Sequence, residues 1–350
     1  MKIAILLGTS ALLCGTLMAD NRFSAEVEYL LFQAHQDGLF RATDIYFPPQ
    51  VNDTTEAIAK DKYVEDNRWN SGVRASFTWE PECRPWKISA QYTYLARTIS
   101  SGLLERSFTG NVFNENNHVV LTDYMTNQIA GPFVYTNQAS WKFSFNQLDL
   151  VIEQPFGIGG DSYLTPYFGL RGLCLEQHVQ MSAHNTAPNA NVEFFSVTHQ
   201  MHIDPKLCGV GLVGGLEGRF SLGCGFDLWG KIGGGLIWGR FQTHQSDVVA
   251  MADGSSTFSS ETNTHNFWGT CLNANLGLGV EWSCALNDES QWVVVTFGWE
   301  NHLYMKTNNA QNFFLEDVSI DPFKTITLDR NVQRGDFSLQ GFSLGASYFF

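Results

Sequence analysis

Charged side chains are scarce in this sequence of 350 residues. Asp, Glu, Lys and Arg make up 16% of the chain, whereas a soluble globular domain usually carries about 25%. Basic residues are the scarcer kind, since 21 Lys and Arg stand against 35 Asp and Glu, for a net charge of −14. Binding to phosphates needs clustered Lys and Arg, so this balance argues against nucleic acid as a partner.

Long hydrophobic runs are missing beyond the N-terminus. No later stretch reaches the roughly 18 apolar residues that a transmembrane helix needs, and the mean hydropathy is −0.13. Aromatic residues nevertheless make up 14% of the chain, and there are 32 glycines. A chain with too little charge for a soluble domain and no apolar helix fits a membrane β-barrel, which alternates apolar and polar side chains.

The N-terminus has the pattern of a secretory signal peptide. Lys2 supplies a positive charge, Ile3 to Leu17 form an apolar core, and small or medium residues precede a cleavage site after Ala19. We therefore expect residues 1–19 to be removed and residues 20–350 to form one exported domain. Export places the mature chain in the periplasm or beyond.

The rest of the chain alternates between polar segments and stretches with period-two patterning. In the clearest stretch, Trp69 and Trp79 bracket about ten residues, the length of a tilted membrane strand, and indoles favour both water interfaces. Ten such stretches are joined by connections that alternate long and short, as in outer-membrane barrels. The sequence predicts an all-β fold: an antiparallel transmembrane β-barrel of about ten strands, with short periplasmic turns and long extracellular loops. A further hairpin around Leu39 to Phe47 would raise the count to twelve.

The fourth predicted strand changes phase along its length. Its apolar residues occupy odd positions from Trp141 to Phe145 and even positions from Leu148 to Ile152. An extra residue in one strand of a pair would shift the alternation in this way. We therefore predict a β-bulge near Asn146 and Gln147.

The last predicted strand ends on an aromatic residue, with strict alternation from Phe337 to Phe350. Ser343, Gly345, Tyr348 and Phe350 resemble, position for position, the C-terminal signal of bacterial outer-membrane barrels. This resemblance implies recognition by the barrel assembly machinery and location in a bacterial outer membrane, with outer-membrane lipid as a partner.

Several short segments extend the likeness to a family. They are Glu28–Phe32 followed by Asp37-Gly38-Leu39, Leu148–Leu150, Leu164–Gly172 and Gly298–Glu300. In these segments the chain resembles the pore-forming, major-outer-membrane-protein-like family of Legionella and the environmental chlamydiae. The resemblance implies an abundant outer-membrane barrel with pore activity and, in chlamydial relatives, disulfide cross-linking.

Charged residues on the polar faces of the predicted strands are candidates for lining a pore, seven of each sign. An open, water-filled lumen would use them as a passage for small hydrophilic solutes or ions with little ion preference. In a narrow barrel they would instead neutralise one another and fill the interior. The resemblance favours a porin for passive diffusion and ion transport, with a further structural role in the envelope. The candidates are Arg74, Lys87, Arg97, Lys142, Arg171, Arg219, Lys231, Glu80, Asp149, Glu153, Glu217, Asp227, Glu281 and Glu300.

Six cysteines follow the predicted signal peptide, and an exported location permits disulfides. Three lie in predicted periplasmic turns, two flank one outer loop, and one points inward. Cysteines on one side of a barrel suit links between molecules, so we hypothesise cross-linking to neighbouring envelope proteins; unpaired, incidental cysteines are the alternative. In the order just given they are Cys83, Cys224 and Cys284, then Cys174 and Cys208, then Cys271.

Two other function classes compete with a porin. The long outer loops carry an excess of acidic residues, so the chain could be a non-conducting surface adhesin or structural barrel that acts through those loops. Glu300 and His302 share one face of the ninth predicted strand, which invites comparison with an omptin-like hydrolase at the barrel rim. Such a site needs several carboxylates to converge with the histidine, and we identify no further partner. We expect no enzymatic activity.

No cofactor or metal site is expected either. Gly209 to Gly214 match the dinucleotide fingerprint, but that motif needs a strand that turns into a helix, and here it lies within an alternating strand. Glycines that let a barrel wall curve explain it better. Four histidines of the third long loop, namely His178, His184, His199 and His202, have no recognised ligand spacing.

Overall fold

The computed structural model describes residues 22–37, 40–46, 58–63, 68–81, 84–100, 104–108, 118–121, 133–159, 161–186, 197–251, 257–286, 291–308, 317–321, 324–327 and 335–350. The predicted signal peptide and Cys83 lie outside these ranges. Within the described part of the chain, no helix is long and apolar enough to cross a membrane.

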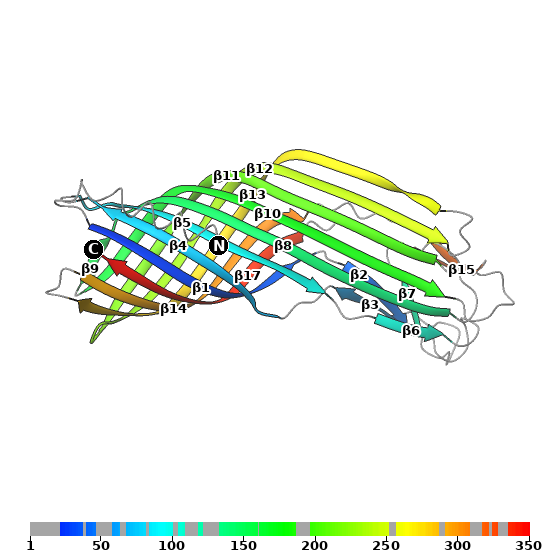
Figure 1. Ribbon diagram of the computed structural model, residues 1–350, viewed down its shortest axis with the longest axis horizontal. Coiled ribbons are helices and arrows are strands. Elements are labelled where there is room, and N and C mark those ends of the chain that lie inside the picture. The colour runs from blue at the N-terminus through cyan, green and yellow to red at the C-terminus, as the bar shows by residue number, and fades with distance from the viewer. Residues whose placement is uncertain are drawn as a thin grey trace, which may run out of the picture.

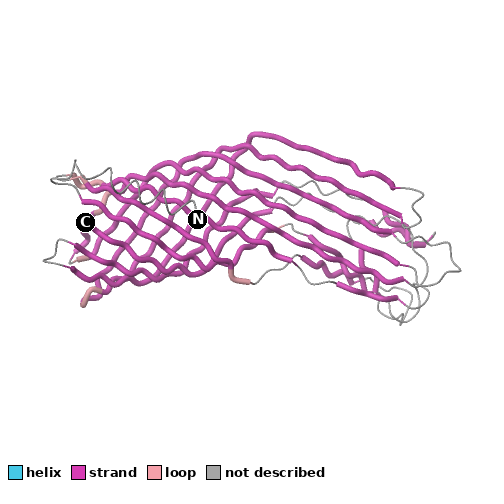
Figure 2. The backbone as a smooth tube through the Cα atoms, viewed as in Figure 1, coloured by secondary structure: helices cyan, strands magenta, loops and turns pink. Residues whose placement is uncertain are grey.

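Ten antiparallel strands close into a barrel. Its circular order is β8-β5-β4-β1-β17-β14-β13-β12-β11-β10, and β10 pairs back onto β8 (Figures 1 and 2). This confirms the predicted fold and the strand count of ten. The strands are β1 (Arg22–Gln36), β4 (Asn70–Glu80), β5 (Lys87–Ser100), β8 (Phe133–Glu153), β10 (Ser162–Thr186), β11 (Val197–Gly223), β12 (Phe226–Met251), β13 (Thr257–Leu286), β14 (Gln291–Asn308) and β17 (Gly335–Phe349).

Seven shorter strands are not part of the closed ring of ten strands. β6 (Leu104–Phe108) pairs with β8, and β9 (Phe156–Gly159) pairs with β10. β2 (Phe40–Tyr46), β3 (Ile58–Tyr63) and β7 (His118–Leu121) form a separate sheet, as do β15 (Asp317–Asp321) and β16 (Lys324–Thr327). The extra hairpin suspected around Leu39 to Phe47 thus exists as β2 and β3, but it lies outside the barrel wall.

The barrel strands differ greatly in length. β10 to β13 have 25, 27, 26 and 30 residues, whereas β1 has 15 and β4 has 11. Since a tilted membrane strand needs about 9–11 residues, the longer strands continue well past a bilayer. Figure 2 shows this continuation at the end of the molecule opposite the C-terminus. An even strand count puts both chain ends in the periplasm, so the long strands project from the outer surface.

Within the membrane belt the wall alternates as the sequence predicts. On β17, Leu344 is 52% exposed and Phe342 is 40% exposed, whereas the intervening Ser343 is 3% exposed. On β13, Trp268 and Trp282 stand outward at the two ends of the belt, which suits indoles at the two interfaces. Apolar side chains therefore face lipid, and small or polar side chains face the lumen.

The predicted bulge near Asn146 and Gln147 is wrong. Both residues keep continuous register with β10 on one side and with β5 on the other. The change of phase reflects a change of surroundings: Leu148 faces outward with 55% exposure, whereas Trp141 and Phe143 face inward with at most 1% exposure. Beside the bilayer the outer face of a strand meets lipid, but above the bilayer it meets water and only the inner face can bury apolar groups.

The upper part of the barrel therefore has a packed hydrophobic core, which we call the apolar layer. Aromatic rings from different strands are in contact there: the ring centroids of Phe145 and Tyr304 are 5.5 Å apart, and those of Phe143 and Phe337 are 5.7 Å apart. The apolar layer comprises Leu30, Phe32, Ala34, Leu95, Ile99, Ala139, Trp141, Phe143, Phe145, Leu173, Leu175, Val179, Met181, Ile203, Leu207, Ile237, Phe241, Cys271, Tyr304, Phe337 and Leu339.

Candidate functional site

Below the apolar layer, the barrel encloses a cavity of about 550 Å³ that we call the lumen cavity. Charged, polar and apolar side chains line this cavity. Most of the charged residues proposed from the sequence as pore-lining meet at this cavity, namely Arg74, Glu80, Lys87, Asp149, Glu153, Arg171, Glu217, Arg219, Lys231, Glu281 and Glu300.

Three of the proposed residues lie elsewhere. Arg97 shares the inward register of β5 but donates a hydrogen bond to the carbonyl oxygen of Trp69 at 2.6 Å. Asp227 is directly opposite Glu281 in the β12–β13 ladder, at the periplasmic end. Lys142 is exposed between the buried Trp141 and Phe143, so its assignment to the lumen is wrong. The phase change in β8 is the reason.

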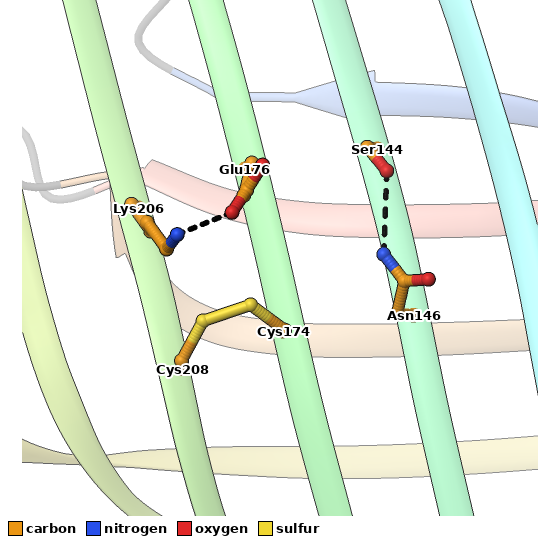
Figure 3. Close-up of a disulfide and its surroundings, with 6 residues drawn as sticks. All are labelled: Ser144, Asn146, Cys174, Glu176, Lys206 and Cys208. Carbon is orange, nitrogen blue, oxygen red and sulfur yellow. Dashed lines mark hydrogen bonds and ion pairs between the residues drawn. A yellow bond between two sulfur atoms is a disulfide. The ribbon is translucent and has the colours of Figure 1, made fainter.

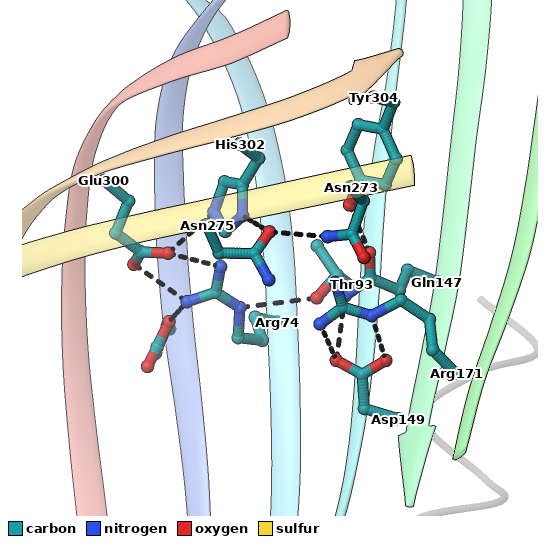
Figure 4. A network of polar contacts seen from close by, with 11 residues as sticks. Arg74, Thr93, Gln147, Asp149, Arg171, Asn273, Asn275, Glu300, His302 and Tyr304 are labelled. Carbon is teal, nitrogen blue, oxygen red and sulfur yellow. Dashed lines mark hydrogen bonds and ion pairs between the residues drawn. The ribbon is translucent and has the colours of Figure 1, made fainter. Parts of the chain in front are cut away.

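Arg74 is the centre of the main charge network of the lumen cavity (Figure 4). Its Nη1 lies 2.6 Å from Glu28 Oε2 and 2.8 Å from Glu300 Oε1, and its Nη2 lies 2.8 Å from Glu300 Oε2. Its Nε donates to Thr93 Oγ1 at 3.3 Å. One guanidinium thus links β4 to β1, β5 and β14. Each of its three nitrogens has an acceptor, so the geometry is that of a structural ion pair.

Glu300 and His302, the pair that suggested a hydrolase, are in contact. His302 Nε2 lies 2.9 Å from Glu300 Oε2, and its Nδ1 lies 3.0 Å from the side-chain amide of Asn275. Both oxygens of Glu300 already accept hydrogen bonds from Arg74. Both oxygens of Glu300 are therefore engaged with other side chains, and the arrangement favours a structural role over activation of a water molecule.

A second ion pair lies beside the first. Arg171 donates through Nε and Nη2 to the two oxygens of Asp149, both at 2.7 Å, the two-pronged geometry that strengthens such bonds. Gln147 donates to Asp149 at 2.8 Å and accepts a hydrogen bond from Tyr304 (Figure 4). Tyr304 also belongs to the apolar layer. It therefore joins the charged network to the hydrophobic core above it.

The periplasmic half of the lumen cavity holds further ion pairs. Arg219 lies 3.1 Å from Glu217 and 2.8 Å from Glu281. The ammonium of Lys87 is 3.8 Å from Glu80 and 3.6 Å from Glu153. Except for Glu281, these side chains are more exposed than those around Arg74, and water screens such pairs.

Sequence reasoning missed two carboxylates of this cavity, Glu26 and Glu28. They alternate with the outward Ala25, Val27 and Tyr29 on β1, so the period-two pattern contained the signal. With them, eight carboxylates line the lumen cavity against five Lys and Arg, an excess of three in place of the predicted balance. The carboxylates are those of Glu26, Glu28, Glu80, Asp149, Glu153, Glu217, Glu281 and Glu300.

Glycines on β11 and β12 make room for closely packed neighbours. A Cβ on Gly211 would lie 1.9 Å from the carbonyl oxygen of Leu236, and one on Gly233 would lie 2.0 Å from the hydroxyl of Tyr167. Tyr167 thus lies flat against the wall, with the ammonium of Lys231 4.8 Å from its ring centroid. Gly209 to Gly214 lie within β11, so the fingerprint match has no strand-to-helix turn.

Two cysteines form a disulfide. Cys174 and Cys208 are directly opposite in the β10–β11 ladder, and their sulfurs are bonded on the outer face of the wall (Figure 3). Among the other candidates, Cys271 is buried in the apolar layer, whereas Cys224 is exposed in the turn between β11 and β12. Cross-linking through Cys284 or Cys224 stays a prediction.

The loop histidines do not gather into one site in the described residues. His178 Nδ1 lies 2.8 Å from Asp204 on the outer face. The side chains of His184 and His199 lie outside the described part of the structure. Within that part, no group of three or more His, Cys, Asp or Glu residues is placed to hold a metal ion.

Residues 18–350 match the family described as the Legionella pneumophila major outer membrane protein precursor. The chain belongs to this family, and its fold and family both place it in the outer membrane. No curated protein matches the chain in sequence.

Solved structures with similar folds share little sequence with the chain. The outer membrane protease OmpT from Escherichia coli has 10% identity and a TM-score of 0.34, covering 96% of this chain and 99% of that one. A major outer membrane protein from Thermus thermophilus has 12% identity and a TM-score of 0.28, covering 94% and 99%. Ail of Yersinia pestis has 8% identity and a TM-score of 0.24, covering 95% and 99%.

Proposed function

We propose that this member of the Legionella major outer membrane protein family is a closed structural barrel that stabilises the envelope and carries its outer loops at the cell surface. One observation supports this proposal most directly: every barrel strand contributes an inward side chain that is at most 1% exposed. These residues are Leu30, Asn70, Leu95, Phe143, Leu175, Leu207, Ile237, Cys271, Tyr304 and Phe337. A water-filled passage would expose some of them.

The energetics favour a permanent closure. Opening a passage would separate rings such as Phe145 and Phe337, whose centroids are 6.1 Å apart. Exposing a buried Phe side chain to water costs about 1.5–3 kcal/mol, and a passage would expose several at once. Side chains of the apolar layer therefore act as the core of the projecting part of the barrel.

A porin for small hydrophilic solutes is the second candidate, and the lumen cavity favours it. Burying charged groups is expensive, and inward ionisable residues commonly mark solute pathways in membrane proteins. The cavity of about 550 Å³ is lined by charges of both signs. Under this alternative the apolar layer would have to open during transport.

Single-channel conductance separates the two candidates. The full-length protein is refolded into a planar bilayer and recorded at two salt concentrations, beside a variant with Phe145→Ala and Phe337→Ala. Phe297→Ala is the matched control, since this ring is 49% exposed on the lipid face. For a closed barrel we expect no discrete steps from the unaltered protein or from the control.

Steps that scale with salt in the unaltered protein would overturn the closed barrel and establish the porin. Steps only in the double variant would locate the closure in the apolar layer. The envelope role has its own test: cells that lack the protein should become more sensitive to detergent while small-solute uptake stays unchanged. Lost uptake with unchanged detergent resistance would contradict it.

A further inference from the structure

Outward-facing tryptophan and arginine residues indicate where the bilayer ends on the outer face of the barrel. On β12 and β13, Trp238 and Trp268 stack with ring centroids 4.7 Å apart, and indoles concentrate at membrane interfaces. The next outward residue of β12 is Arg240, which is directly opposite Trp268 in the ladder. Arg240 is therefore at the level of the lipid headgroups of the outer leaflet.

Basic residues in regular outward positions are confined to one side of the barrel. The described barrel strands hold three of them: Lys142 on β8, Lys206 on β11 and Arg240 on β12. The regular outward positions of β1, β4, β5, β14 and β17 hold no Lys or Arg within the described residues. Lys306 lies at a register shift near the outer end of β14. We call Lys142, Lys206 and Arg240 the cationic face.

The members of the cationic face lie at one height. Ladder rows climb around the barrel from β8 to β12, because Glu153 at the periplasmic end of β8 shares its row with Tyr167, well inside β10. Counted along its own strand, Lys142 lies four residues further from the periplasm than the ladder row that contains Arg240. Lys206 lies two residues further from the periplasm than that row. With strands about 4.8 Å apart and tilted by about 40°, these offsets cancel the climb and space neighbouring cations about 10 Å apart.

The charges of the cationic face are only partly neutralised by the described residues of the protein. Lys206 forms an ion pair with Glu176 (Figure 3). Arg240 and Lys142 are exposed and have no carboxylate partner among the described residues. Asp204, the other outward acid nearby, is held by His178 at 2.8 Å. Among the described residues, two cations are thus without an acidic partner in a chain whose net charge is −14.

We propose that the cationic face binds an outer-leaflet glycolipid that carries more than one phosphate, of the lipopolysaccharide type. On β12 the lipid belt continues directly into this face, so the acyl chains of such a lipid would pack beside Trp238. Arginine holds a phosphate through two parallel hydrogen bonds. Because Lys142 is separated from Arg240 around the barrel, it would contact a second phosphate of the same lipid. The Cys174–Cys208 disulfide joins β10 to β11 between them.

Binding of purified lipopolysaccharide to the full-length protein in detergent micelles tests the proposal. The variant Arg240→Ala with Lys142→Ala leaves the Lys206–Glu176 pair intact. Its matched control is Arg22→Ala with Arg84→Ala, which removes the same charge from exposed positions at the opposite end. Heat-modifiable migration in gels verifies that each variant is folded.

We expect the affinity to fall at least tenfold in the Arg240/Lys142 variant and to stay unchanged in the control. Lipopolysaccharide stripped of its lipid phosphates should bind the unaltered protein as weakly as the intact lipid binds the variant. Equal loss in both variants would mean unspecific attraction and would overturn the proposal. So would an affinity that does not depend on the phosphates. Conductance plays no part in this readout, so failure of the proposed function would not affect it.

Discussion

Replacement of Arg74 by methionine should destabilise the barrel more than loss of any other single charge in the lumen cavity. The side chains of Arg74, Glu28 and Glu300 are 9%, 11% and 9% exposed. Each pair gains about 4 kcal/mol of Coulomb attraction at a charge separation of about 4 Å and an effective dielectric constant of about 20. Desolvation offsets most of that gain while both partners are present.

Once the guanidinium is gone, two carboxylates stay buried without a cation. Breaking a buried pair in this way costs about 3–5 kcal/mol, which we expect as the loss in the free energy of unfolding for Arg74→Met. Adding Glu28→Gln and Glu300→Gln removes the stranded charges. The triple variant should therefore recover to within about 1–2 kcal/mol of the unaltered protein, since a well-packed neutral replacement is often tolerated.

Urea unfolding of the barrel in lipid vesicles, followed by tryptophan fluorescence, measures these changes. Lys87→Met is the control from the same cavity, because its ammonium is 3.6–3.8 Å from its carboxylates and its side chain is 25% exposed. Solvent-screened pairs of this kind contribute about 0–1 kcal/mol. The reasoning is refuted if Arg74→Met costs no more than Lys87→Met, or if the triple variant is less stable than Arg74→Met.

Three further outcomes are expected. Gly233→Ala should cost about 1–3 kcal/mol of unfolding free energy because its Cβ overlaps the Tyr167 hydroxyl, and urea unfolding should show a smaller cost in a Tyr167→Phe background; equal costs would contradict this. Peptide mapping of thiol-blocked protein should recover Cys174 linked to Cys208, and its reduction should cost at most about 4 kcal/mol for a separation of 34 residues. Alkylation of both sulfurs before reduction would disprove the link. An impermeant maleimide should label a variant that keeps Cys224 alone only after the outer membrane is permeabilised; labelling of intact cells would reverse the assigned orientation.

The sequence predicts the inward charges well where strands cross the membrane. Arg74, Arg171 and Glu300 alternate with apolar neighbours, and a strict period of two assigns them to one face. Their partners were not predictable in the same way. Arg74 and Glu300 are 226 residues apart in the chain, and only closure of the barrel brings β4 and β14 onto opposite flanks of β1 and β17.

The apolar layer in the upper barrel was not predicted from the sequence, and β1 shows why. Glu28, Leu30 and Phe32 share the inward face, with Glu28 in the lumen cavity and the other two in the apolar layer. The sequence shows the apolar side chains, but a run such as Leu30-Leu31-Phe32 contains residues of both faces. Whether the lumen stays open depends on the barrel diameter and on the side chains that all the strands point into it.

By itself, the sequence determined the strand alternation, a barrel of about ten strands and the membrane location, because scarce charge and period-two apolar stretches suit strands that meet lipid on one side. Only the tertiary structure decided where each strand leaves the bilayer. Trp141 and Leu148 are equally apolar, yet one faces the core and the other faces lipid. Period-two alternation shows which side chains share a face, but the surroundings of that face depend on the height of the strand in the assembled barrel.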